Sequence, residues 1–338
     1  MRDLSDDEMK GEVDALGMSA GARIGVAAAG LALLGVAGYR RDLRRDRERL
    51  AAVERELIDT PCGRLEYARA GEGPPVLVVH GVLGGRDFGV GAGRVNVPAG
   101  HRVISPSRFG YLGSPFPPDR SPSAQADAFA ALLDHLDIAA LCVVAFSAGS
   151  TSAVWLALRH PERVLRLVLI SPNAPHPRPL PKPPRALAPI LFSQPVFWAL
   201  RLLARSRLEG LSGTPAGFVA DERERAALRE IVDSLFPVGP RAAGTIYDGY
   251  TGNLDIARCP FEEISVPTLV VHAADDALSP YRDARAMTER IPGARLVTVA
   301  RGGHTLTHLD PTARRAVEQF LRGAYAPAPI AAVAQGGR

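Results

Sequence analysis

One short stretch of the chain has the residue types and the spacing that nucleophilic catalysis needs. An apolar run, Leu141–Phe146, leads into Ser147, which is followed by Ala148 and Gly149. With Ala145 two positions before it, Ser147 lies in the pattern G-x-S-x-G with alanine in place of the first glycine. This pattern can present a serine hydroxyl on a sharp turn between a strand and a helix. In a chain rich in Ala and Gly, an ordinary strand-to-helix turn also fits these residues.

The residues after Ser147 supply the helix that such a turn requires. A helical run from Ser152 to His160 ends at Pro161, because proline cannot continue a helix. The backbone N–H of Ala148 is then expected at a helix N-terminus, pointing toward the same place as the serine hydroxyl.

Strand and helix patterns alternate around this stretch and predict an α/β fold. Strands are predicted at 76–79, 102–105, 141–146, 164–170, 268–272 and 295–299, and the near-continuous apolar run at 76–79 is typical of a strand buried on both faces. Helices are expected between them, one of them capped by Ser123. We therefore expect a mostly parallel, doubly wound sheet with helices on both faces, whose ligand site lies beyond the carboxyl ends of the strands.

Two parts of this region depart from the alternation. Residues 57–70 are expected to form two short strands around a turn at 61–63. Residues 173–258 are proline-rich at first and then carry amphipathic patterns at 190–204 and 222–235, so we expect a mostly helical insertion. The tail at 323–338 is dominated by Ala, Pro and Gly and is expected to be disordered.

Four potential site residues each follow a predicted strand. They are His80, Ser147, Asp276 and His304. Because the carboxyl ends of parallel strands meet at one edge of a sheet, all four are expected on the same rim.

In these features, residues 57–322 resemble the α/β-hydrolase fold family. The matching signals are His80-Gly81 after a strand, the loop 107–114, the turn at Ser147, Asp276 before Pro280, and Gly303-His304 after the last strand. The chain order of serine, acid and histidine is the one this family uses. The insertion at 173–258 falls where the family places its cap domain.

The resemblance implies a role for each residue of a triad. Ser147 would be the nucleophile, His304 the base that takes its proton, and an aspartate would hold the imidazole in the right tautomer. Two aspartates are adjacent. The family's usual spacing from Ala273 and from Pro280 favours Asp276, which leaves Asp275 facing solvent or capping the turn.

An oxyanion hole needs two N–H donors. Ala148 would supply one and, by analogy with the family, Val82 the other. His80 is expected to orient the loop that carries Val82 rather than to take part in the chemistry.

The resemblance implies a serine hydrolase that cleaves a small-molecule ester, or an amide, through an acyl-enzyme, without a cofactor. Its substrate-binding residues are not identifiable from the sequence. Two alternatives remain open: a hydrolase of carbon–carbon bonds on the same fold, and a non-catalytic binding protein of the fold.

Charge and cysteine usage argue against other classes of site. The net charge is +4, and the only long basic tract is 40–49, which gives nucleic-acid binding little support. The three cysteines are far apart without a C-x-x-C spacing, and His304 and His308 lack the adjacent glutamate of H-E-x-x-H, so no metal site is predicted.

The N-terminal segment predicts a membrane anchor. A polar tail at 1–14 precedes 15–39, which contains a single charge at Arg23 and is long enough to span a bilayer. A basic juxtamembrane helix is expected at 40–56, and its arginines would keep the catalytic domain in the cytoplasm. The alternative is an Ala-rich helix of a soluble cytoplasmic protein.

Overall fold

The computed structural model describes residues 20–177, 182–211, 213–215, 217–218, 220–306 and 310–324. The chain divides into two compact units, Met1–Glu48 and Arg49–Arg338. Within the first unit the described residues form most of one long helix, α2 (Ala20–Ala51). The predicted polar tail at 1–14, nearly all of the predicted C-terminal tail, and His308 lie outside the described residues.

The second unit is built on an eight-stranded sheet. Its strands are β1 (Glu56–Thr60), β2 (Gly63–Ala70), β3 (Pro75–Val79), β4 (Arg102–Pro106), β5 (Leu141–Phe146), β6 (Val164–Ile170), β7 (Thr268–Ala273) and β8 (Arg295–Val299). They lie in the order β1-β2-β4-β3-β5-β6-β7-β8. The pairs β1–β2 and β2–β4 are antiparallel and all other pairs are parallel. The predicted sheet is confirmed.

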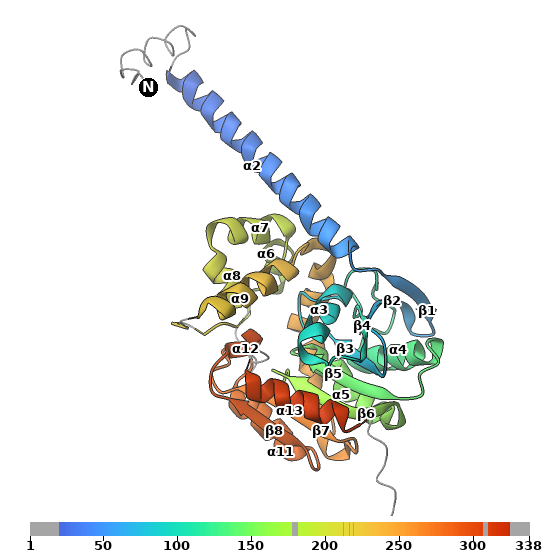
Figure 1. The fold of residues 1–338 in the computed structure, drawn as a ribbon. Helices are drawn as coiled ribbons and strands as arrows, with labels where there is room; N and C mark the ends of the chain where they lie inside the picture. The colour runs from blue at the N-terminus through green and yellow to red at the C-terminus, as the bar shows by residue number, and fades with distance from the viewer. Residues whose placement is uncertain are drawn as a thin grey trace, which may run out of the picture. The chain divides into compact units, whose positions relative to one another are not determined.

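Helices cover both faces of this sheet (Figure 1). On one face α4 (Pro122–His135), α5 (Gly149–Arg159) and α11 (Tyr281–Arg290) contribute to a core with alternate residues of the strands. On the other face α3 (Arg86–Asn96) and α13 (Pro311–Arg322) do the same. Because both faces are buried, all six residues of β5 are buried, which explains its unbroken apolar sequence.

The stretch between β6 and β7, where a helical insertion is expected, is helical. It carries α6 (Ala188–Leu191), α7 (Gln194–Leu203), α8 (Arg205–Leu211), α9 (Glu222–Ser234) and α10 (Ala242–Tyr250), joined by short 3₁₀ turns. A separate apolar cluster holds α7, α8 and α9 together around Phe197, Val232 and Phe236. The pattern at 190–204 is divided between α6 and α7, because Pro195 begins a new helix in its first turn.

Two local predictions need correction. Ser121, not Ser123, caps α4, because its side chain accepts the N–H of Ala124 and Pro122 occupies the first helical position. The basic helix expected at 40–56 is part of α2 and ends earlier, at Ala51, and β1 begins at Glu56.

The predicted membrane span is not supported. Among the described helices, none is by itself both long and apolar enough to cross a bilayer. Alanine and glycine dominate the uncharged part of α2 and bury little apolar surface each, which explains the shortfall. One bent pair of helices, Arg185–Leu191 with Gln194–Leu203, passes the same test on length and composition.

Candidate active site

Ser147 sits on a strained turn between β5 and α5. Its φ of 49° lies in the left-handed region that residues with a side chain rarely adopt. Glycine is required two residues after Ser147, because a Cβ at Gly149 would lie 2.5 Å from the carbonyl oxygen of His80. Gly81 also approaches closely, since a Cβ there would lie 3.0 Å from the Cβ of Ser147. The strand, turn and small neighbours are those that the sequence pattern predicts.

Asp276 and His304 meet beyond the ends of neighbouring strands. Asp276 follows β7, and His304 lies in a short helix, α12 (Gly303–Leu306), after β8. The Nδ1 of His304 is 2.8 Å from Oδ2 of Asp276. Of the two adjacent aspartates, the one selected by spacing is therefore the one that contacts the histidine.

The Asp276 carboxylate is saturated with hydrogen-bond donors. Its Oδ1 accepts the backbone N–H groups of Leu278 at 2.8 Å and Ser279 at 2.9 Å. Its Oδ2 faces His304 and also Nε2 of His272, 3.2 Å away. Burial by itself would raise the pKa of Asp276, but the hydrogen bonds from His272, His304 and Ser279 outweigh it and hold the pKa well below its ordinary value. The group is therefore a carboxylate throughout the neutral range.

His272 is a residue of this site that the sequence did not reveal. It is fully buried in β7, and its Nε2 lies 2.8 Å from the carbonyl oxygen of Ser279 as well as near Asp276. Both neighbours are acceptors, so Nε2 must carry the proton, and the buried Nδ1 is left without a hydrogen-bond partner among the described residues. The only sequence signal is its position four residues before Asp276.

Asp275 has a different role from the one expected. Instead of facing solvent or capping its own turn, its carboxylate accepts the N–H groups of Gly302 at 3.2 Å and Gly303 at 2.8 Å. These two residues directly precede His304, so Asp275 holds the backbone of the loop that carries the histidine.

The loop after β3 is oriented by His80, as expected. The fully buried ring accepts the backbone N–H of Arg108 at Nε2, 2.9 Å away, so its proton is on Nδ1, which donates to the carbonyl of Gly81 at 2.7 Å. Burial, and after it the charge of Arg108, keeps the pKa of His80 far below its ordinary value. In a trans peptide the C=O and the next N–H point in opposite directions, so holding the Gly81 carbonyl fixes the direction of the Val82 N–H.

A buried ion pair ties this loop to the helical insertion. Arg108 donates from Nε to the carbonyl of His80 at 2.9 Å and from Nη1 to Asp248 of α10 at 3.0 Å. Tyr111 also bonds to Asp248. All three side chains are nearly inaccessible to solvent, which makes this connection a rigid one.

A cavity of about 250 Å³ opens beside Ser147. Ser147, His304, Gly81 and Val82 contribute to its wall, so the structure brings the predicted nucleophile, base and one oxyanion donor to one space. Ala148 is buried directly after Ser147 at the start of α5, and Asp276 lies behind His304. The apolar part of the wall comes mainly from α3, α9 and the strand ends, with Phe88, Ala92, Val95, Phe146, Ile170, Ala227, Ile231, Leu235 and Leu278.

The charged residues among the described lining of this cavity are acidic. They are Asp87, which is paired with Arg241 at 2.7 Å, and Glu230, which is exposed. Apart from His304, the described lining contains no basic side chain that could hold an anionic ligand.

Comparison with known proteins identifies relatives of the same architecture. The sequence profile described as alpha/beta hydrolase fold matches residues 74–311. A 2-hydroxymuconate semialdehyde hydrolase of Pseudomonas putida is 31% identical over 271 residues, which cover 76% of this chain and 90% of that protein. A pimeloyl-[acyl-carrier protein] methyl ester esterase of Aromatoleum aromaticum is 31% identical over 244 residues, covering 67% of this chain and 90% of that protein.

Solved structures show the same fold. An alpha/beta hydrolase fold protein from Nakamurella multipartita superposes with a TM-score of 0.66 and 31% identity, covering 80% of this chain and 99% of that one. An esterase from Exiguobacterium antarcticum has a TM-score of 0.60 at 18% identity, covers 80% of this chain and 99% of its own, and shows the likeness of the fold alone.

Proposed function

The chain belongs to the α/β-hydrolase fold family and is an enzyme of the hydrolase class, and from this premise we propose that it is a serine hydrolase that cleaves a neutral carboxylic ester. Ser147 is the nucleophile, His304 the base and Asp276 the acid that orients it. The observation that carries the proposal is the 2.8 Å contact between His304 and Asp276 beside a cavity that His304 and Ser147 both line. Amide substrates remain a variant of the same chemistry.

The geometry supports a two-step reaction. His304 Nε2 takes the proton of the Ser147 hydroxyl as its oxygen attacks the ester carbonyl, and Asp276 stabilises the imidazolium that results. The N–H groups of Val82 and Ala148 stabilise the oxyanion. The imidazolium then protonates the departing alcohol, and a water molecule, deprotonated by His304, hydrolyses the acyl-enzyme to release the acid and free Ser147.

The cavity wall favours an uncharged, apolar acyl group. A carboxylate placed among Phe88, Val95 and Ile231 would lose its hydration without gaining a cation, which is unfavourable. Burial of an alkyl chain on the same residues is favourable by the hydrophobic effect. The substrate class is therefore a neutral ester with a short to medium aliphatic acyl chain.

Carbon–carbon bond hydrolysis is the second candidate. It is favoured by the 31% identity to a 2-hydroxymuconate semialdehyde hydrolase, and it would use the same serine and histidine. A muconate derivative is a carboxylate, however, and the described cavity wall offers it no basic partner except His304. The ester is for this reason the better supported substrate.

Labelling and hydrolysis together test the proposal. We expect a fluorophosphonate probe to label the wild-type chain and Ser234→Ala, which alters another serine of the same cavity wall, but not Ser147→Ala. Ser147→Ala should lose p-nitrophenyl hexanoate hydrolysis by about 10⁴-fold or more. The wild-type chain should prefer this ester over p-nitrophenyl adipate, its ω-carboxylated counterpart, by about tenfold. Undiminished turnover by Ser147→Ala would exclude the assignment, and a preference for adipate would favour the second candidate.

A further inference from the structure

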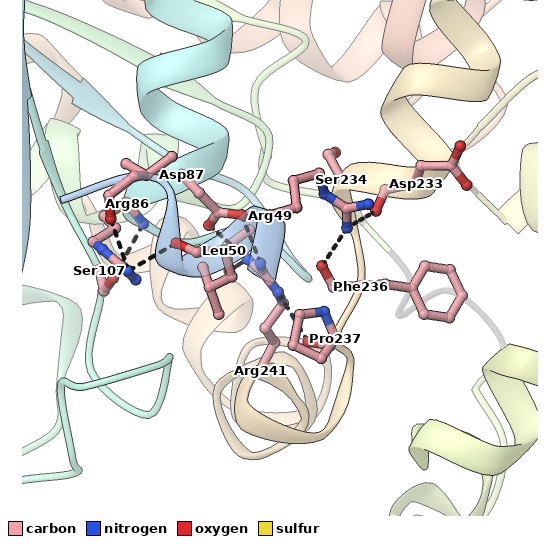
Figure 2. A network of polar contacts seen from close by, with 12 residues as sticks. Arg49, Leu50, Arg86, Asp87, Ser107, Asp233, Ser234, Phe236, Pro237 and Arg241 are labelled. Carbon is pink, nitrogen blue, oxygen red and sulfur yellow. Dashed lines mark hydrogen bonds and ion pairs between the residues drawn. The ribbon is translucent and has the colours of Figure 1, made fainter. Parts of the chain in front are cut away.

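The short segment Arg49–Val53, at the end of α2, makes hydrogen bonds with residues at the ends of two helices that line the cavity, α9 and α3. On one side, Nη2 of Arg49 donates to the carbonyl of Phe236 at 2.7 Å and to that of Asp233 (Figure 2). These carbonyls belong to the last turn of α9 and to the residues just after it. The last carbonyls of a helix have no partner within the helix, and a cation there also interacts favourably with the helix dipole.

On the other side, the segment is held by the first residue of α3. Arg86 donates from Nη2 to the carbonyls of Leu50 and Val53, at 3.1 Å each. Arg86 is 4% exposed and is itself fixed by Glu66, 3.3 Å away and also buried. Arg86 thus connects the segment Arg49–Val53 to the core, and Arg49 connects the helical insertion to the segment.

The two helices joined in this way both line the cavity. Phe88 and Val95 lie on α3, and Ala227 and Ile231 lie on α9. The first turn of α9 is held separately, by Glu224 at 3.2 Å from Arg301, two residues before Gly303. Both ends of α9 are therefore held by arginines on other segments, Arg301 at the start and Arg49 at the end.

A second arginine nearby, Arg241, also connects the insertion to the core, and it is buried where Arg49 is exposed. Arg241 is fully buried and donates to the carbonyl of Pro237 and to Asp87 (Figure 2). It also donates to the carbonyl of Gly84 at 2.7 Å. It holds the loop after α9 against the residues at the start of α3. Arg49, in contrast, is an exposed side chain, so its hydrogen bonds to the carbonyls are accessible to water.

We propose that Arg49–Val53 is a strap that fixes the end of α9 against α3, and that Arg49 is the positioning residue through which this strap sets the width of the acyl pocket. The inference on width rests on the proposed ester hydrolysis, whereas the strap itself does not. Without Arg49 the last turn of α9 frays, the wall formed by Ile231 and Leu235 moves, and a long acyl chain loses its fixed contacts. A short acyl group near Ser147 is unaffected.

Amide hydrogen exchange and substrate length test the strap on the full chain. In Arg49→Ala, the amides of 231–236 should exchange about tenfold faster, as expected when one or two net hydrogen bonds at a helix end are lost. The ratio of kcat/KM for p-nitrophenyl octanoate over acetate should fall about threefold, through KM, with kcat for acetate unchanged. Arg49→Lys, which keeps the charge, should give intermediate values.

The control is Arg47→Ala, which removes an equal charge from an exposed arginine two residues earlier in the same helix. Wild-type exchange in Arg49→Ala, or equal acceleration in Arg47→Ala, would overturn the strap. Faster exchange with an unchanged octanoate-to-acetate ratio would overturn the role in pocket width. If Arg49→Ala does not fold, Arg49→Lys decides by the same two measurements. If no ester is hydrolysed at all, the proposed function fails and the exchange data still decide on the strap.

Discussion

The rim of the sheet, which carries Ser147, Asp276 and His304, and the α9 wall of the same cavity are held in place in very different ways. At the rim, Ser147 stands on a turn between the buried strand β5 and α5, and Asp276 accepts four N–H groups. The wall of α9 belongs to an insertion whose small apolar cluster includes Leu83 of the loop after β3, and arginine contacts with backbone carbonyls also connect it to the core. The proposed catalytic residues are thus positioned by the sheet, whereas the shape of the pocket depends on a small apolar cluster and a few polar contacts.

The largest expected effect is at the rim. Asp276→Asn should lower kcat by about 10⁴-fold, because an amide in this position favours the wrong tautomer of His304. Asp275→Asn should cost far less, since an asparagine oxygen can still accept the N–H groups of Gly302 and Gly303. Steady-state kinetics of the two variants on one ester measure the difference. A larger loss in Asp275→Asn would show that the loop of His304, rather than its tautomer, limits the reaction.

The positions of the rim residues could be predicted from the sequence because each depends on local rules. Ser147 needs small neighbours on a sharp turn, and the family's spacing selects Asp276 over Asp275; Asp276 lies 2.8 Å from His304. His272 could not be predicted, because its role depends on β7 ending so that its ring turns back to Asp276.

The hydrogen bonds that connect the insertion to the rest of the chain could not be predicted for another reason. Arg49 and Phe236 are separated by 187 positions, and Arg241 and Gly84 by 157. Their acceptors are backbone carbonyls, which every residue has and no sequence pattern marks. The sequence instead suggested that the arginines of 40–56 follow a membrane span, which the described helices do not support.

The second-largest expected effect is on the stability of the fold and concerns the buried ion pair between Arg241 and Asp87. Arg241→Met should lower the free energy of unfolding by about 3 kcal/mol, because Asp87 is left nearly buried without its partner. The double variant Arg241→Met/Asp87→Leu should recover part of this loss, since no unpaired charge remains. Denaturant unfolding of wild type, both single variants and the double variant measures it. If the double variant is less stable than Arg241→Met, the packing of the guanidinium matters more than the ion pair.

The smallest expected effect sharpens the description of the rim. His272 and His304 share one oxygen of Asp276, at 3.2 and 2.8 Å, and the hydrogen bond from His272 is one of those that lower the pKa of Asp276. In His272→Phe the carboxylate loses this donor, so the pKa of Asp276 rises toward its ordinary value. A lowered carboxylate pKa stabilises the fold at neutral pH, and this stability is lost as the pH falls through that pKa, so in His272→Phe the contribution should be smaller and should be fully lost at a higher pH.

The shift should be less than about one pH unit, because only one neutral donor is removed and the two backbone donors to Asp276 remain. The pH dependence of the free energy of unfolding measures it. Tyr281→Phe is the control: the Tyr281 ring lies 6.2 Å from that of His272, and its hydroxyl bonds to Thr298 rather than to the carboxylate. A change in packing alone would lower the free energy of unfolding by the same amount at every pH. A shift to lower pH in His272→Phe would mean that His272 does not stabilise the Asp276 carboxylate.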